Sequence, residues 1–178
     1  VSAIIEDKLN QQATLAKDYA FWDETIQHAY HTQNTKWIDQ NLGAYLTATF
    51  KVTDLFIING HNKPVLSLKD GQFDNSNYKT INKTALISLI NKARLSAPLP
   101  VPVSGILRIN NFPAIVGASI LAPEDGPILP APQPVLVVIK RLETEQLLEI
   151  SKQYRLKELQ FSAKQPVKKH EVFLEIIN

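Results

Sequence analysis

Apolar residues in the first 31 positions recur at the spacing of one face of an α-helix. Neither Pro nor Gly interrupts this segment, and at about 100° per residue its apolar positions fall on one stripe. The residues of this stripe are Ile5, Leu9, Ala16, Tyr19, Trp22, Ile26 and Tyr30. The pattern predicts one helix over residues 1–31, roughly 45 Å long and longer than a compact domain needs. A second helix is expected from Asn34 to Phe50.

From residue 52 onward the pattern changes to short β-branched and aromatic runs separated by turn residues. These runs predict strands at Val52–Asn59, Val65–Leu68, Gly105–Asn110, Pro113–Leu121, Val135–Leu142, Leu156–Phe161 and Glu171–Ile177. Further helices are expected at Thr84–Leu95 and Glu143–Tyr154, a polar loop up to about Thr80, and extended chain at Ala97–Pro102. This order predicts an α+β fold, in which helices lie on the face of one antiparallel, PAS-like sheet. We expect one domain over residues 1–178, helical in 1–50 and sheet-based in 51–178.

The composition excludes several classes of protein. Lys and Arg total 19 against 17 Asp and Glu, a net charge of +2, whereas nucleic-acid binders usually show a clustered basic excess. There is no Cys, so a disulfide, a thiolate metal site and a Cys nucleophile are excluded. No apolar run reaches the roughly 18 residues of a membrane span, and no signal-peptide pattern opens the chain. The chain also lacks Met, so we expect it to be a piece of a longer protein.

Sequence signatures of common enzymes are missing: there is no nucleophile elbow, phosphate loop, dinucleotide fingerprint or His-Glu-x-x-His motif. We therefore expect no catalytic residue and no cofactor. Glu24, His28 and His31 have the spacing of metal ligands on one helical face. That face lies opposite the apolar stripe, where nothing would form a second shell around a metal ion. A solvated Glu–His pair is the better interpretation, and no metal site is predicted.

One carboxylate falls inside the apolar stripe of the first helix. Asp23 lies between apolar neighbours, while Asp18 lies at the edge of the stripe beside Trp22. A buried carboxylate must be hydrogen-bonded or paired, because an isolated buried charge is very costly. One interpretation is a structural role, in which a basic residue or backbone donors satisfy the carboxylate, and Arg141 at the end of an apolar strand is the first candidate. The other is that Asp18, Tyr19, Trp22 and Asp23 line a ligand pocket. Both interpretations can hold together.

Phe21 lies on the outer side of the same predicted helix. A lone exposed Phe is common and usually carries no function. On a helix that overshoots its domain, it is also the residue type expected at a dimer seam. The second interpretation predicts a parallel homodimer that pairs the first helices in the intact protein.

Several segments resemble one known family. The segment Ala16–Tyr30 (AKDYAFWDETIQHAY), followed by Trp37 and Asn41–Leu46, resembles the opening of the fourth class of CHASE domains. The similarity continues through Thr53–Asn59 and returns at Val135–Leu159. These are extracytoplasmic sensor domains of bacterial cyclic-di-GMP enzymes and histidine kinases. The resemblance covers nearly the whole chain, and its Asp-Tyr-Ala-x-Trp-Asp core is its most specific part.

The resemblance implies a PAS-like or Cache-like sensor that lies between two membrane helices outside this chain. The domain would face the periplasm or the cell exterior, and the first helix and the last strand would lead to the two spans. One feature departs from the family pattern. The family tends to have a glycine before the basic residue that ends the later strand, and here Ile139 precedes Lys140.

The sequence and the resemblance together suggest where a ligand would bind. We expect the site between the sheet, at Phe56 and Arg141, and the aromatic segment Tyr19–Trp22, with Arg108 or Arg141 meeting an acidic ligand. The leading hypothesis is a non-catalytic, ligand-sensing input domain of a dimeric membrane receptor. The alternative is an interaction module that senses a periplasmic protein without a small ligand. A hydrolase of unfamiliar type is the third hypothesis.

Overall fold

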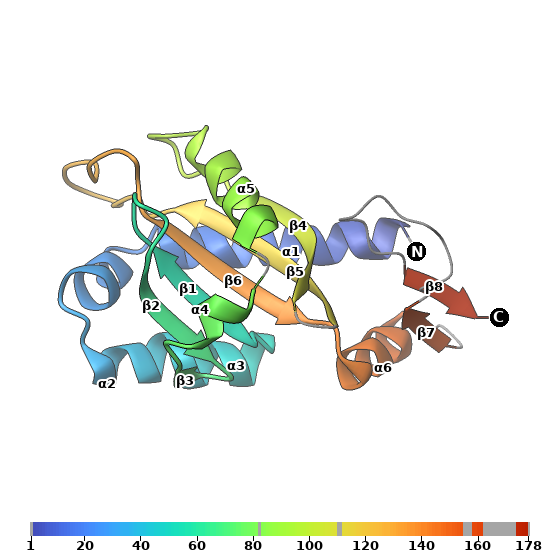
Figure 1. Ribbon diagram of the computed structural model, residues 1–178. Helices are drawn as coiled ribbons and strands as arrows, with labels where there is room; N and C mark the ends of the chain where they lie inside the picture. Colours follow the sequence, from blue (N-terminus) through green and yellow to red (C-terminus); the bar gives the residue numbers. More distant parts are fainter. Residues whose placement is uncertain (1, 82, 110–111, 155–157, 162–173, 178) are drawn as a thin grey trace.

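A computed structural model describes residues 2–81, 83–109, 112–154, 158–161 and 174–177. Its centre is a six-stranded sheet in which every neighbouring pair is antiparallel (Figure 1). In spatial order the strands are β3 (Gln72–Phe73), β2 (Pro64–Lys69), β1 (Asp54–Ile58), β6 (Val135–Arg141), β5 (Phe112–Ile120) and β4 (Val103–Ile109). The expected α+β fold with a PAS-like antiparallel sheet and a long N-terminal helix is confirmed.

The N-terminal helices cover one face of the sheet. They are α1 (Ser2–Ala20), the π-helical segment η1 (Thr25–His31), α2 (Thr35–Ile38), the π-helical segment η2 (Asp39–Gly43) and α3 (Ala44–Phe50). Asn34 begins the second group, because its side chain accepts a hydrogen bond from the backbone N–H of Trp37 at 3.1 Å. The apolar stripe of these helices packs on alternate residues of the strands, such as Leu55 and Ile57 of β1 and Leu136 and Val138 of β6.

Two further helices cover the opposite face. They are the short α4 (Asn77–Thr80) and the amphipathic α5 (Lys83–Arg94). Leu86 and Ile90 of α5 pack on the other alternate set of strand residues. This set comprises Phe56, Ile58, Ala114, Val116, Ala118, Ile120, Val135, Val137 and Ile139. The sheet therefore has two apolar faces and lies between two helical layers.

A third, smaller cluster lies beyond the end of β6. Helix α6 (Thr144–Gln153) packs Leu147 and Ile150 against Ile115 of β5 and against Ile4 and Leu9 of α1. The strands β7 (Glu158–Phe161) and β8 (Leu174–Ile177) pair with each other in a separate two-stranded sheet. The start of α1, α6 and this strand pair gather at one end of the molecule (Figure 1). No helix in the described ranges is long and apolar enough to cross a membrane.

Helix α1 lies unusually close to the sheet. A Cβ atom built on Gly117 of β5 would lie 2.1 Å from the backbone oxygen of Gln12. Ala16 and Ala20, further along the same helix, are fully buried. The absence of a side chain at Gly117 thus lets the helix backbone rest on the strand backbone.

The prediction of one helix over residues 1–31 is wrong. Helix α1 ends at Ala20, and the chain turns at Phe21 before η1 begins. The turn is fixed from outside the helix, because the backbone N–H of Ala122 donates to the carbonyl of Ala20 at 3.1 Å. The chain then reverses to cover β1 and β2, so one continuous apolar stripe serves two separate helical segments.

Other element predictions need smaller corrections. The chain after α5 forms turns over residues 95–98 before it extends, so Ala97–Pro102 is not extended throughout. The segment expected as a loop before Thr80 contains β3 and α4. The last two strands form their own sheet and do not extend the central one. Residues 110, 156–157 and 171–173 of the expected strands lie outside the described residues.

Candidate functional site

The turn after α1 gives Asp23 a backbone donor, one of the two kinds of partner expected for it, but not a place inside a helix. Its Oδ1 accepts a hydrogen bond from the backbone N–H of Glu124 at 2.8 Å, and its side chain is half-buried. Asp23 therefore satisfies a loop backbone and does not lie in the apolar arc of a continuous helix. Phe21 is half-buried at the same turn, so the outward-facing helical position from which a dimer seam was inferred does not exist.

Aromatic rings gather around the same turn. The ring of Trp22 lies between those of Tyr19 and Trp37, with centroid separations of 5.9 and 5.2 Å. His28 also stacks on Trp37, with ring centroids 5.2 Å apart, and its Nε2 contacts Oε2 of Glu24 at 2.9 Å. This is the intrahelical Glu–His pair that the spacing predicted. Among the described residues there is no group of His, Asp and Glu that could hold a metal ion.

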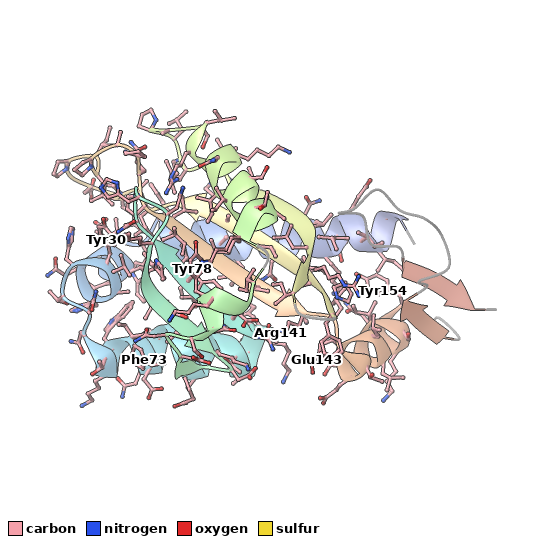
Figure 2. The ribbon with its side chains drawn as sticks, in the orientation of Figure 1. Tyr30, Phe73, Tyr78, Arg141, Glu143 and Tyr154 are labelled. Atoms are coloured by element: carbon pink, nitrogen blue, oxygen red, sulfur yellow. The ribbon has the colours of Figure 1, made fainter. Side chains whose placement is uncertain are left out.

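Arg141 pairs with Asp54 and not with Asp23. Its Nη2 donates to Oδ1 of Asp54, and both side chains are buried. Asn77 of α4 donates to the same oxygen at 2.6 Å, and the Thr53 hydroxyl donates to Oδ2 at 2.7 Å. Arg141 lies at the end of β6 beside α4 (Figure 2). The expected Asp23–Arg141 pair is thus wrong, since a neighbouring strand supplies the carboxylate.

The expected pocket between Tyr19–Trp22 and Phe56–Arg141 is also wrong. Phe56 points to the α5 side of the sheet, where its ring packs at 5.5 Å on that of Tyr78. Tyr19 packs with the core on the opposite face. Because successive residues of a strand point to opposite faces, the two halves of the expected pocket are separated by the sheet itself.

A cleft does lie on the α1 side of the sheet. We call it the α1 cleft; its volume is about 650 Å³, and it lies between α1, the end of α3 and strands β5 and β6. Its lining residues are Lys8, Asn10, Gln11, Gln12, Thr14, Leu15, Asp18, Tyr19, Phe50, Ile115 and Lys140. The volume is within the range of small-molecule sites. Two of the expected site residues, Asp18 and Tyr19, are therefore part of its wall.

Two titratable groups of the α1 cleft are perturbed by their surroundings. Burial lowers the pKa of the Lys140 ammonium, and the nearby charge of Lys8 lowers it further, while Glu149 opposes the change. Burial raises the pKa of the Tyr19 hydroxyl, with smaller contributions from Tyr45 and Asp18. Each shift disfavours the charged form of its side chain.

The other expected site residues lie elsewhere. Trp22 and Asp23 belong to the turn after α1, Phe56 and Arg141 to the opposite side of the sheet, and Arg108 is exposed on the edge strand β4. None of these five lines the α1 cleft. Of the seven expected site residues, the structure places only Asp18 and Tyr19 in the wall of the α1 cleft.

Gln12, Phe50 and Lys140 also line the cleft and were not predicted from the sequence as site residues. Gln12 had a visible signal: it occupies the stripe position between Leu9 and Ala16 and is only 6% exposed. A polar residue within an apolar stripe is a signal of the same kind as Asp23. Lys140 was noted only as the basic residue that ends a strand, because its role depends on which face of the sheet it occupies.

Comparisons with known proteins agree with the fold. Two crystal structures of the Vibrio cholerae LuxQ periplasmic domain are similar to this chain, with TM-scores of 0.54 and 0.52 at 13% and 14% identity. In both comparisons 94% of this chain is covered, together with 80% and 81% of the LuxQ chains. A comparison with curated protein sequences gives no match.

A family model describes nearly the whole chain. The CHASE4 domain model matches residues 4–162, which include both helical layers and the entire central sheet. The match agrees with the resemblance carried by the segment around Asp18–Asp23. The chain belongs to the CHASE4 domain family, whose members are extracytoplasmic sensory input domains of bacterial signalling proteins.

Proposed function

We propose that this chain is a non-catalytic input domain that senses a small ligand in the α1 cleft. The observation that carries the proposal is the cleft itself, which α1 borders from Lys8 to Tyr19. In this proposal residues 1–178 form one sensor domain of a homodimeric membrane receptor. Its output is a cyclic-di-GMP enzyme or a histidine kinase.

The position of the cleft supports a route from ligand to output. Helix α1 rests directly on β5 where Gln12 crosses Gly117, and it is linked to α6 where the Lys8 Nζ donates to Oε1 of Gln153 at 2.9 Å. The cleft lies beside this supported helix, between it and α3. A ligand that fills the cleft shifts the position of α1 relative to the sheet. Small helix shifts of this kind are a common signalling step.

The proposal can be tested before the ligand is identified. Thr14 is exposed at the cleft wall, so Thr14→Trp would fill the cleft without disturbing the core. Lys17→Trp is the matched control, because Lys17 is an exposed residue of α1 that does not line the cleft. We expect native mass spectrometry of the wild type and of Lys17→Trp, purified from the natural host, to show a retained small molecule that Thr14→Trp lacks. If all three proteins retained the same molecule in equal amounts, or if none retained any, the result would argue against the proposal.

One observation favours the alternative of an interaction module. The loop after α5 exposes 86% of Leu95, 66% of Leu99 and 54% of Val101. Arg94 ends α5, directly before this loop. Its Nε donates to the carbonyl of Gln133 at 3.0 Å and so links the end of α5 to the loop over residues 121–134 before β6. Exposed apolar residues gathered at one end are typical of a protein-binding surface.

The two functions make opposite predictions for the intact receptor. If the loop binds a protein partner, Leu95→Asp abolishes the response while Thr14→Trp leaves it unchanged. If the α1 cleft is the sensor, Thr14→Trp alters the response and Leu95→Asp does not. Lys17→Trp should behave as the wild type in both cases.

A further inference from the structure

We propose that the α1 cleft takes an amphipathic anion, with a carboxylate head at Lys140 and an apolar body along Leu15, Ile115 and Phe50. This inference rests on the proposed function, because it names the class of ligand for the same cleft. It is carried by the side chains of the cleft wall and by the polar groups that they leave without partners.

The cleft contains an ammonium group without a counter-ion. Within the described ranges the Nζ of Lys140 forms no hydrogen bond and no ion pair, although the side chain is half-buried. The positive charges of Lys8 and Lys51 both disfavour its protonation, and among the described residues the charge of Glu149 opposes them. A charge in such a place costs free energy that an incoming anion offsets.

The wall also contains an unsatisfied amide. The Nε2 of Gln12 is buried and has no hydrogen-bond partner among the described residues, and Gln12 as a whole is 6% exposed. A buried donor without an acceptor is costly, so a native protein that keeps one usually has a use for it. A ligand acceptor oxygen would satisfy it once the Gln12 side chain turns, because Nε2 has almost no accessible surface as it stands. Lys140 is therefore the donor that the cleft presents directly.

The negative charge of the wall lies away from these donors. Among the residues that the structure describes, Asp18 is the only acidic one that lines the cleft. It follows Lys8 by ten residues along α1, a distance of about 15 Å at the rise of an α-helix. An anionic head near Lys140 and Lys8 would therefore not meet Asp18, and an elongated ligand has room between them.

Apolar side chains form the remainder of the wall. Leu15 and Ile115 are buried, and Phe50 is 41% exposed at the cleft edge, with its ring against that of Tyr45 at 6.1 Å. Apolar walls with a few placed polar groups are the usual composition of small-molecule sites. Phe50 is therefore the side chain best placed to close over the body of the ligand.

The two arginines that were expected to bind an acidic ligand are not available to a ligand in the α1 cleft. Arg141 is buried and already paired with Asp54. Arg108 is exposed on the edge strand and does not line the cleft. Lys140 is the cation that combines partial burial, a cleft and no partner among the described residues.

The test is a calorimetric titration of the protein with three probes, each built on an unbranched ten-carbon chain. They are decanoate, decan-1-ol and decyltrimethylammonium, each below its micellar concentration. We expect decanoate to bind, and to bind at least about tenfold more tightly than the other two. Equal or tighter binding of the alcohol or the cation would overturn the inference.

Variants locate the binding of decanoate. Lys140→Met should weaken it at least about tenfold, Lys140→Arg should largely restore it, and Thr14→Trp should abolish it. The matched control is Lys92→Met, since Lys92 is an exposed lysine of α5 on the opposite side of the sheet. Unchanged affinity in Lys140→Met or in Thr14→Trp would overturn the inference.

The outcome also separates this inference from the proposed function. If the natural host supplies a retained molecule that Thr14→Trp removes, yet decanoate fails to bind or is not preferred, the cleft is a ligand site and the anionic class is wrong. If Thr14→Trp removes nothing, the proposed function itself fails.

Discussion

Asp54 and Arg141 neutralise each other between neighbouring strands, with Asn77 and Thr53 completing the hydrogen bonds of the carboxylate. Removing one partner of a buried ion pair leaves an uncompensated charge, which is far more costly than removing both. We therefore expect Asp54→Ala to lower the free energy of unfolding by about 3 kcal/mol or more. The double variant Asp54→Leu/Arg141→Met should lose much less. Urea unfolding measures both.

Asp23→Ala is the control for that prediction. It removes one hydrogen bond to the backbone of Glu124, so it should cost about 1 kcal/mol. The helical pattern alone predicts a larger loss of stability for Asp23→Ala than for Asp54→Ala, because a helical wheel drawn for one continuous helix places Asp23 among apolar residues. A cost at Asp23 that equals or exceeds the cost at Asp54 would contradict the structure.

Lys140 should reduce the stability of the unliganded domain. Burial and the charge of Lys8 lower its pKa below the ordinary 10.5, so the folded state resists protonation more than the unfolded state does. The resulting cost is fully present below the lowered pKa and disappears as the pH rises to 10.5. Lys140→Met should therefore be more stable than the wild type at pH 7, by up to about 1 kcal/mol, and this advantage should shrink towards pH 10.5. An advantage that grows with pH would contradict the assignment.

At the scale of elements, the contact between α1 and β5 depends on Gly117. A Cβ there would lie 2.1 Å from the backbone oxygen of Gln12, and backbone atoms of a packed helix give way only at a cost. Gly117→Ala should lower the free energy of unfolding by about 1–3 kcal/mol. It should also widen the α1 cleft, because it lifts the helix that forms one wall.

Gly105→Ala is the matched control. Gly105 lies on the neighbouring strand β4 and faces α5, where the nearest atom to a built Cβ is Leu89 Cδ1 at 3.6 Å, an ordinary contact. Its effect should be within about 0.5 kcal/mol. Thermal and urea unfolding of the two variants separate a close approach from a general intolerance of alanine in these strands.

The sequence predicted which segments form helices and strands far better than it predicted where the first helix ends and the chain changes direction. Residues 1–31 have one apolar stripe and no helix breaker, yet the chain turns at Phe21 because a distant residue, Ala122, donates to the last carbonyl of α1. Local pattern contains no information about such a contact. The strand positions were easier, because their β-branched runs and turn residues are local signals.

At the scale of the molecule, the antiparallel sheet was predictable and the site was not. A strand residue faces one side or the other according to register, and this decides that Phe56 and Tyr19 lie on opposite sides of the sheet. The same alternation brings Lys140 into the α1 cleft, while its neighbour Arg141 turns to Asp54 on the other side. Of the residues expected to bind a ligand, only Asp18 and Tyr19 lie in the wall of the α1 cleft.

If the α1 cleft is the sensory site, its occupancy changes the output of the receptor. The chain contains no Cys, so Thr14→Cys introduces a single thiol at the cleft wall and Lys17→Cys a single thiol outside it. The measurement is the output activity of the intact receptor in membranes, before and after labelling with a bulky maleimide, with the labelled wild type as background control. We expect labelling to change the output of Thr14→Cys and to leave that of Lys17→Cys unchanged. Complete labelling of Thr14→Cys without any change in output would contradict this expectation.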